Sequence, residues 1–178
     1  VFGGAGYATS AIEAICSASR VATRDFYTLF GTKSRLLLAV DERIVAEVAR
    51  QINDALAAGP FDVAETMHVG LRAYAEYFAA DPRRVRVHFF EVFAIAAEAW
   101  EHRRATGDRL MEILVEHARE LTERGLIPRR DLSITSGALL GATRYAMTDW
   151  AVDPGAHSID QVVAELARLY TAALRDPA

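Results

Sequence analysis

The stretch SAIEAICSASRVATRDFYTLFGTKSRLLLAV, residues 10–40, decides the fold that we expect for this chain. It predicts two short helices around a tight turn, followed by a longer helix, which is the pattern of a helix-turn-helix. Ser10 and Glu13 have the spacing of a capping box, so we expect them to start the first helix. The apolar residues of that helix recur at i, i+3 and i+4, which predicts one buried face formed by Ile12, Ile15 and Cys16.

The second helix is predicted over residues 22–29, after a turn at residues 19–21. Phe26 and Phe30 lie four residues apart, so they share a face that we expect to point into the core. The opposite face then carries polar side chains that can reach base edges and phosphates in a DNA groove. These side chains are Thr23, Arg24, Tyr27 and Thr28.

Residues in and around this stretch occupy the places of a known motif: Tyr, two residues, Ser or Thr, then Ile-Ala, Gly-Val and Phe-Tyr-x-x-Phe-x-x-Lys. The matching residues are Tyr7, Ser10, Ile15, Val21, Phe26, Tyr27, Phe30 and Lys33. In this pattern the chain resembles the N-terminal domain of the TetR family of transcriptional repressors. Two positions differ, because Arg20 stands where the family usually has the turn Gly and Leu29 where it usually has His or Tyr. A non-Gly residue in a left-handed turn costs roughly 1 kcal/mol, which a packed domain can absorb.

The resemblance implies a role for each polar residue of the motif. Thr23 and Arg24 would contact bases, and Arg24 is our first choice for sequence specificity. The DNA backbone would be held by Ser10, Tyr27, Thr28 and Lys33. The alternative is an exposed helix whose polar side chains are accidental, and the buried Phe26 and Phe30 argue against it because they force this polar face outward.

The net charge of −4 argues at first against a nucleic-acid partner. The charge is unevenly distributed, however, since residues 16–35 contain four basic side chains and one acidic one. They are Arg20, Arg24, Lys33 and Arg35, against Asp25. A local basic face on an acidic body suits a protein that binds a specific DNA site while its body repels non-specific nucleic acid.

Length and composition indicate a compact soluble protein, for which a reducing cytoplasm fits best, and the resemblance implies a bacterial one. The chain has 178 residues, of which 52% are hydrophobic, enough for a small N-terminal domain and a larger second one. No apolar run approaches the roughly 18 residues that a membrane span requires. Cys16 is the only cysteine, so no intrachain disulfide is possible. The sequence starts at Val1 without Met, and we expect that the natural N-terminus and part of a first helix are missing.

Beyond residue 45 the sequence predicts a succession of helices, and so an all-α fold. Gly and Pro cluster at a few places only, near residues 59–60, 81–82, 125–128 and 153–155. The helical periodicities between them cover residues 34–58, 62–80, 83 to about 97, 107–124, 133–152 and 158–174. With the N-terminal helices this makes about nine. We therefore expect a DNA-binding domain at 1–45 and a helical ligand-binding and dimerisation domain at 46–178.

The last two helices have more apolar surface than one packing face can use, which predicts a partner subunit. Gly137 and Gly141 have a small-xxx-small spacing that lets another helix approach closely. The resemblance implies a twofold dimer built as a four-helix bundle, so that two recognition helices enter successive major grooves about 34 to 36 Å apart. The predicted interface residues are Gly137, Gly141, Tyr145, Leu166, Leu169, Tyr170 and Ala173.

A dense aromatic segment, residues 88–100, predicts an apolar pocket for a hydrophobic or amphipathic effector. These rings could simply fill the core, but the resemblance implies an effector cavity among the middle helices. The predicted lining residues are Arg72, Tyr74, Phe78, His88, Phe89, Phe93, Trp100, Thr143, Met147 and Trp150. Among them His88, Arg72 and Thr143 are candidates to orient a ligand by hydrogen bonds.

No motif indicates catalysis, a metal or a cofactor. The five histidines are scattered, and no pair of them with an acidic neighbour amounts to a metal site. Gly3 to Gly6 follow no strand and lack the Lys-Ser/Thr ending of a phosphate loop. We expect neither a catalytic residue nor a metal nor a cofactor, and we do not expect an enzyme.

The sequence thus predicts a dimeric, ligand-responsive DNA-binding regulator, most simply a repressor that a hydrophobic small molecule releases from a palindromic operator. An activator with the same fold would carry the same residues. A third possibility is a helical dimer that binds small molecules and has lost operator binding. Arg20, Asp25 and Leu29 keep that possibility open, because an acid in a recognition helix repels phosphate unless it pairs with a neighbouring Arg or accepts from cytosine.

Overall fold

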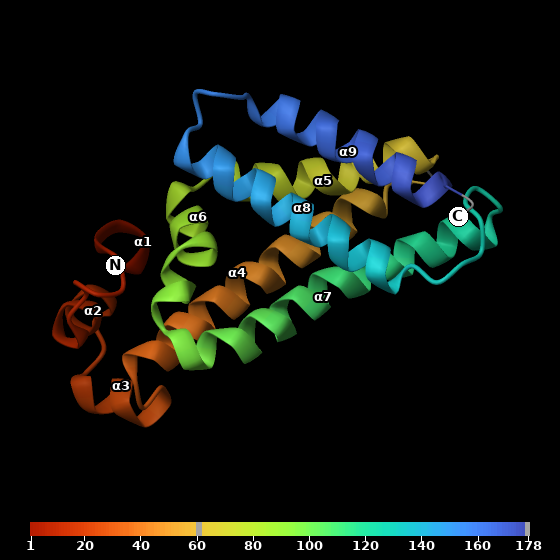
Figure 1. Cartoon of the computed structure of the whole chain (residues 1–178). Helices are drawn as coiled ribbons and strands as arrows, with labels where there is room; N and C mark the ends of the chain where they lie inside the picture. The colour runs from red at the N-terminus through yellow and green to blue at the C-terminus, as the bar shows by residue number, and fades with distance from the viewer. Residues whose placement is uncertain (60–61, 177–178) are drawn as a thin grey trace.

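The computed structural model describes residues 1–59 and 62–176, with all side chains in these ranges except those of residues 96–98. Within these ranges all regular structure is helical, nine α-helices and one short 3₁₀-helix, as the sequence predicts. In Figure 1 the first three helices form a small unit at one end, and the remaining helices form the body. No helix of the described residues is long and apolar enough to cross a membrane.

The N-terminal unit consists of α1 (Phe2–Ala5), α2 (Ile12–Ser19) and α3 (Thr23–Leu29), followed by α4 (Lys33–Leu56). The predicted turn between α2 and α3 is confirmed. Arg20 has φ 57° and ψ 36°, and it is the only described residue other than glycine with a positive φ. This is the left-handed conformation in which the family usually has Gly.

The predicted capping box at Ser10 and Glu13 is wrong. The helix α2 begins at Ile12, its N-cap residue is Ala11, and no side chain caps it. Ser10 therefore lies one residue too early to serve as the cap. It is 3% exposed, and its hydroxyl donates to the carbonyl oxygen of Gly6 at 2.5 Å.

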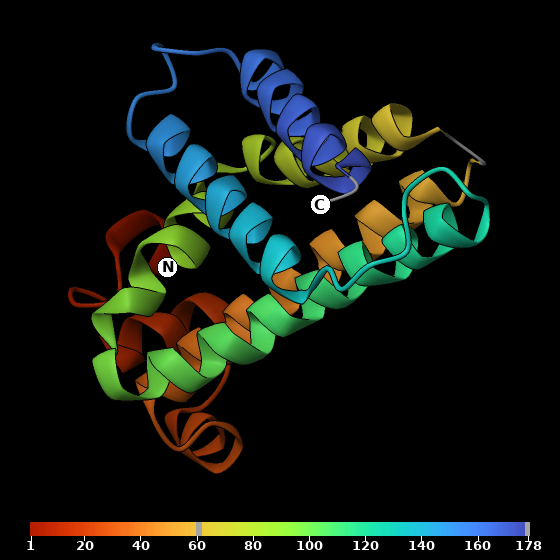
Figure 2. The ribbon, with the colours of Figure 1, turned by 45° about the vertical axis from the view of Figure 1, so that its right-hand side comes forward.

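The body is a ring of five long helices closed at one end by a short one. The ring consists of α4, α5 (Val63–Ala79), α9 (Ile159–Arg175), α8 (Ser133–Val152) and α7 (Ala96–Glu123). Each of these helices packs against the next, and α7 packs back against α4 (Figures 1 and 2). At one end α6 (Pro82–Phe89) and η1 (Glu91–Ala94) contact several of them, while α6 also contacts α1. A ring of helices leaves space along its axis, and this determines where a ligand can bind.

Local signals explain where most body helices begin. The side chain of Thr32 accepts from the backbone N–H of Arg35 at the start of α4. Capping boxes start two further helices, Asp62 with Glu65 at α5 and Ser158 with Gln161 at α9. At α6 the carboxylate of Asp81 caps the helix and Pro82 occupies its first turn.

Two predicted boundaries are wrong in the aromatic segment. The helix predicted from 83 to about 97 ends at Phe89, and the helix predicted from Gly107 begins already at Ala96. A glycine inside a helix costs only about 1 kcal/mol, and no described atom other than its own helix lies near the missing side chain of Gly107. The early break after Phe89 brings Val92 into the core, where it is 1% exposed.

Candidate DNA interface and effector pocket

The outer face of α3 carries the predicted base-contacting residues. Phe26 is 2% exposed and anchors the helix, so Thr23 and Arg24 point to solvent on the opposite side. Tyr27 is 52% exposed and Leu29 is 70% exposed. In Figure 1 this helix lies at the extreme end of the molecule. An exposed helix with mixed polar, basic and apolar side chains has the chemistry needed to fit a major groove.

Lys33 and Ser10, two of the predicted DNA-backbone contacts, are engaged inside the N-terminal unit. The Nζ of Lys33 donates to the carbonyl oxygens of Tyr7 at 2.8 Å and of Ser10 at 3.0 Å. It also lies 4.4 Å from the centre of the Tyr7 ring. These contacts bind the first turn of α4 to the segment before α2. In this structure the two side chains stabilise the unit that presents α3, and Ser10 is not on its surface.

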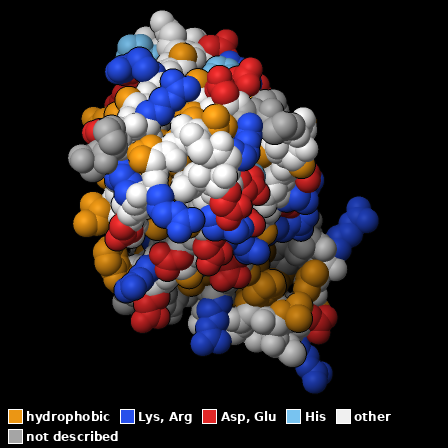
Figure 3. All heavy atoms as spheres, turned by 90° about the vertical axis from the view of Figure 1, so that its right-hand side faces the viewer, with side chains coloured by type: hydrophobic (Ala, Val, Ile, Leu, Met, Phe, Trp, Pro, Cys, Tyr) orange, Lys and Arg blue, Asp and Glu red, His pale blue; other side chains and the backbone are white. Residues whose placement is uncertain are grey.

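The surface away from α3 has no large area of one charge in the view of Figure 3. Basic and acidic side chains alternate there, and basic ones extend from the lower edge, at the height of α3 in Figure 1. The described ion pairs of the body include several between residues four apart on one helix, such as Arg43 with Glu47. Such pairs partly offset the acidic charge of the body, whereas residues 16–35 contain four basic side chains and one acidic one.

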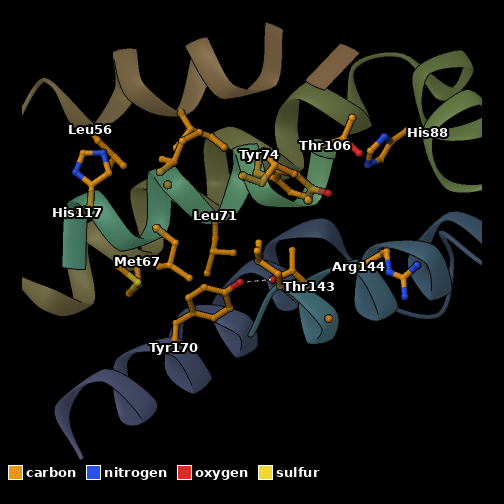
Figure 4. A pocket seen from close by; sticks show the side chains of 18 of the residues that line it. Leu56, Met67, Leu71, Tyr74, His88, Thr106, His117, Thr143, Arg144 and Tyr170 are labelled. Atoms are coloured by element: carbon orange, nitrogen blue, oxygen red, sulfur yellow. Dashed lines mark hydrogen bonds between the residues drawn. The ribbon is translucent and has the colours of Figure 1, made fainter. Parts of the chain in front are cut away.

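A cavity of about 230 Å³ runs along the axis of the helical ring. Every ring helix contributes to its wall, and His88 of α6 and Phe93 of η1 contribute at one end. Apolar side chains dominate the lining and include Ile52, Leu56, Met67, Leu71, Leu110, Ile113, Leu114 and Leu140. In Figure 4, Leu56, Met67 and His117 lie together at one end, while His88 and Thr106 lie at the other. The cavity therefore has an apolar end and a polar end.

Two hydroxyl groups meet in the wall of the cavity between these ends. The hydroxyls of Thr143 on α8 and Tyr170 on α9 lie 2.7 Å apart (Figure 4). Burial raises the pKa of Tyr170 to about 12, so its hydroxyl stays protonated at neutral pH. Tyr170 is 4% exposed. This hydrogen bond therefore joins two ring helices inside the protein.

A buried carboxylate lies at the polar end of the cavity. Asp41 of α4 is 1% exposed, and its two oxygens lie 2.7 Å from His88 Nδ1 and 2.7 Å from His102 Nε2. Burial alone would raise the pKa of Asp41, but the hydrogen bonds with His102 and His88 outweigh it and hold the pKa below its usual 3.8. Three helices, α4, α6 and α7, thus meet at one charged group. We refer to Asp41, His88 and His102 as the Asp41 cluster.

The sequence reasoning did not identify Asp41 as part of this site, although a signal is present. Asp41 lies four residues after Leu37 and four before Val45, both fully or almost fully buried on α4. An acid on the apolar stripe of a helix needs a partner, because an unpaired charge in the core is costly. The partners come from α6 and α7, far along the chain.

Of the ten predicted pocket residues, four line the cavity: Tyr74, His88, Phe93 and Thr143. Three others belong to the packed core, since Phe78 and Met147 are 0% exposed and Phe89 is 4% exposed. Arg72 lies at the surface and binds Asp160 at 2.9 Å. Trp100 is 72% exposed on α7, and Trp150 borders a separate hollow beside α6. Helical periodicity predicts which face of a helix is buried. It does not distinguish a buried side chain that borders the cavity from one that packs against other core side chains.

Comparison with known proteins adds to this geometry. Residues 62–174 match the family described as tetracyclin repressor-like, C-terminal domain. The chain belongs to the TetR family. No curated protein matches it in sequence.

Solved structures of other TetR-family proteins share the fold at low sequence identity. The fatty acid degradation regulator FadR from Bacillus halodurans is 19% identical, with a TM-score of 0.82 over 96% of this chain and 88% of that one. FadR from Bacillus subtilis, solved in complex with stearoyl-CoA, is 17% identical, with a TM-score of 0.82 over 97% of this chain and 93% of that one. PfmR from Thermus thermophilus is 18% identical, with a TM-score of 0.66 over 98% of this chain and 94% of that one.

The predicted dimer residues of this TetR-family chain fall into three groups by exposure. Tyr145 is 75% exposed and Leu169 is 41% exposed, and Gly141 is exposed as well. Leu166 and Tyr170 are 6% and 4% exposed and face the interior of their own chain. Gly137 and Ala173 are half-buried. Two further apolar residues of α8, Ile134 and Val152, are 87% and 70% exposed and were not among those predicted.

The Asp41 cluster brings together three side chains of metal-ligating type in the part of the chain that the structure describes, but they are hydrogen-bonded to one another. There, no group of three or more His, Cys, Asp or Glu residues is arranged to hold a metal ion. Cys16 is buried at 5% exposure on α2 and packs in the N-terminal unit.

Proposed function

We propose that this chain is a dimeric DNA-binding repressor that leaves a palindromic operator when a hydrophobic or amphipathic small molecule enters its cavity. Residues 1–45 would act as the DNA reader and residues 46–178 as the sensor and dimer body. Arg24 and Thr23 would contact bases, while Tyr27 and Thr28 would contact the DNA backbone. Lys33 would hold the reader together and approach a phosphate from the first turn of α4.

The observation that carries the proposal is the course of α4. This helix starts in the reader, where Lys33 binds the segment before α2, and it continues without a break to the cavity. Asp41, Ile52 and Leu56 on the same helix line the cavity wall. A ligand that shifts α4 therefore changes the placement of α3 directly.

The response would be a shift between two populations of the dimer. In one, the two α3 helices are spaced for successive major grooves, and in the other they are not. To move the protein from almost fully bound to almost fully released, the ligand must prefer the released form by about 10⁴-fold. Closing the cavity around a ligand is a source of such a preference, because the ring helices must adjust together.

The cavity wall supports an effector with a long apolar part. Eight of its side chains are large and aliphatic, and they extend to the end where Leu56 and Met67 lie. FadR from Bacillus subtilis, which shares the fold, has been solved with stearoyl-CoA. We therefore place an acyl chain first among the effectors to be tested.

Exposed apolar residues on α8 and α9 support the dimer. Tyr145, Ile134 and Leu169 present apolar area to solvent in the single chain. Two chains related by a twofold axis would bury these faces against each other, and the two α3 helices would then read an inverted repeat.

One observation favours a second candidate, a ligand-binding dimer that does not bind DNA. Asp25 is exposed on α3, and within the described residues it forms no ion pair with Arg24. An unpaired acid on the groove-facing helix repels phosphate, unless the operator offers cytosine as a donor.

Selection of bound sequences from a random duplex pool tests the proposal, using the full-length protein at moderate salt. Enrichment of an inverted repeat, followed by its release on addition of palmitoyl-CoA or another acyl ligand, is the expected result. No enrichment from a folded dimer that binds these ligands would favour the second candidate. An enriched operator that no bound ligand releases would contradict ligand-responsive repression.

A further inference from the structure

The polar end of the cavity contains a buried hydroxyl with no partner. Tyr74 of α5 is 7% exposed and lines the cavity, yet its hydroxyl makes no hydrogen bond with any described residue. In Figure 4 this hydroxyl points toward the end where His88 and Thr106 lie. Tyr170 in the same cavity differs, because its hydroxyl is bonded to Thr143 at 2.7 Å. Buried polar groups are almost always hydrogen-bonded, so an exception that faces a cavity points to a ligand.

The hydroxyl of Tyr74 is available as a donor. Burial raises the pKa of Tyr74 well above its usual value, and the nearby charge of Asp41 raises it further. The group therefore remains a phenol at neutral pH. A phenol O–H that faces an otherwise apolar cavity can donate to an oxygen atom of a bound molecule.

His88 presents a second polar atom to the same end. Its Nδ1 lies 2.7 Å from Asp41, and an ionised carboxylate only accepts, so Nδ1 carries a hydrogen. This contact orients the ring, and His88 lines the cavity. Its Nε2 makes no hydrogen bond with any described residue. Asp41 thus acts as a positioning residue for an atom that remains free to bind a ligand.

Two arginines border the same cavity. Arg103 of α7 lies 4.1 Å from the centre of the Phe93 ring, and Arg144 of α8 is exposed. Asp41 is the only acidic residue in the described lining, and it is already bound to His88 and His102. The charges offered to a ligand at this end are therefore positive.

We propose that the polar end is a head-group site for a long acyl chain that is joined through its carbonyl to an anionic group. Tyr74 Oη donates to the carbonyl oxygen, and His88 donates beside it from Nε2 as an imidazolium, whose Nδ1–H is bonded to Asp41. Arg103 and Arg144 attract the anion, and the chain extends toward Leu56 and Met67. The site rests on the proposed function, in which this cavity holds the effector. It goes further by assigning the residues that select an acyl carbonyl over a plain hydrocarbon. Both fatty acid carboxylates and acyl thioesters of an anionic carrier have this chemistry.

Calorimetric titration of the full chain with three ligands of equal chain length tests the site. Palmitoyl-CoA and palmitate carry the carbonyl, and the thioether S-hexadecyl-CoA carries the same chain length and the same anionic carrier without it. All are used below their critical micelle concentrations. The variants are Tyr74→Phe and His88→Asn. The second is chosen because the Asn amide can replace Nδ1 toward Asp41 and removes only the nitrogen that faces the cavity.

We expect each variant to bind the preferred carbonyl ligand about 3- to 10-fold more weakly, as for the loss of one hydrogen bond, with the affinity for S-hexadecyl-CoA unchanged. Comparing palmitoyl-CoA with palmitate shows which source of the carbonyl the site prefers. Tyr170→Phe is the matched control, because it removes the same atom from the same cavity where that atom already has a partner. Its affinity for the carbonyl ligands should change less than about 2-fold.

Two results would overturn the head-group site. The first is unchanged binding of both carbonyl ligands by Tyr74→Phe and His88→Asn, which leaves the proposed function intact. The second is the absence of binding of all three ligands to the unmodified protein, which also removes acyl chains from the effector class. If the carbonyl ligands bind through Tyr74 but do not release DNA, the site stands and the repression mechanism fails.

Discussion

Replacing Asp41 with Asn should destabilise the protein more than any other single Asp-to-Asn change on α4. The carboxylate accepts from the buried His102 and the partly buried His88, each at 2.7 Å. A hydrogen bond to a charged group contributes about 1.5–3 kcal/mol and a neutral one about 0.5–1.5, so losing the charge at two bonds costs about 2–3 kcal/mol. Asp54→Asn is the matched control. The Asp54 side chain is 66% exposed in its pair with Arg50, and such pairs contribute less than about 1 kcal/mol.

Urea unfolding at fixed protein concentration measures this difference, since a dimer makes apparent stability depend on concentration. The pKa of Asp41 is lowered in the folded protein, so its contribution is fully present above the usual value of 3.8. It is lost as the pH falls through the lower folded value. The difference in the free energy of unfolding between the unmodified protein and Asp41→Asn should therefore be constant above about pH 5 and shrink in strong acid. A loss below about 1 kcal/mol at neutral pH, or equal to that of Asp54→Asn, would refute the reasoning.

Three further predictions concern the reader and its attachment. Arg24→Ala should weaken operator binding by about 1–3 kcal/mol and relax the preference at one base pair in fluorescence anisotropy, whereas equal losses on operator and random DNA would contradict base recognition. Gly3→Ala should lower the free energy of unfolding by about 1–3 kcal/mol, because the added Cβ would lie 2.5 Å from the Cβ and 2.8 Å from the Cα of Arg83 on α6. Gly4→Ala should have little effect, because no described atom outside its own helix lies within 4 Å of the added Cβ. Arg20→Gly should stabilise the protein by up to about 1 kcal/mol in urea unfolding by relieving the left-handed turn, and Ser19→Gly should destabilise it; the opposite order would show that the turn is not strained.

The reader could be predicted from sequence because its signals are local. The turn at Arg20 and the anchoring of α3 by Phe26 each depend on residues within a few positions of each other. The starts of α5 and α9 are also encoded locally, by capping boxes in which Asp62 and Ser158 pair with a residue three positions later. The capping box predicted at Ser10 does not form, although its spacing is correct. The Ser10 side chain is buried and bonded to the carbonyl oxygen of Gly6, so it does not cap α2.

The aromatic segment shows where local information stops. Its rings have helical spacing throughout, but the helix ends at Phe89, and burial of Val92 at 1% exposure accompanies the break. Phe78 and Tyr74 lie four residues apart on α5, yet one fills the core and the other lines the cavity. The difference lies in what other helices place opposite each ring, because His88 and Phe89 of α6 pack against Phe78, whereas Tyr74 borders the cavity.

The sequence by itself determined the all-helical fold, the helix-turn-helix and the family, because periodicity, turn residues and the motif are properties of neighbouring positions. Only the tertiary structure decided the cavity, its polar end and the Asp41 cluster. Asp41 is followed by the charged Glu42 and Arg43, so its local pattern resembles a solvated turn of helix. Its burial follows from the packing of α6 and α7 against α4, which brings His88 and His102 to it from 47 and 61 residues along the chain. Such long-range contacts leave no periodic signal, because they arise from where helices meet rather than from the order of residues within any one helix.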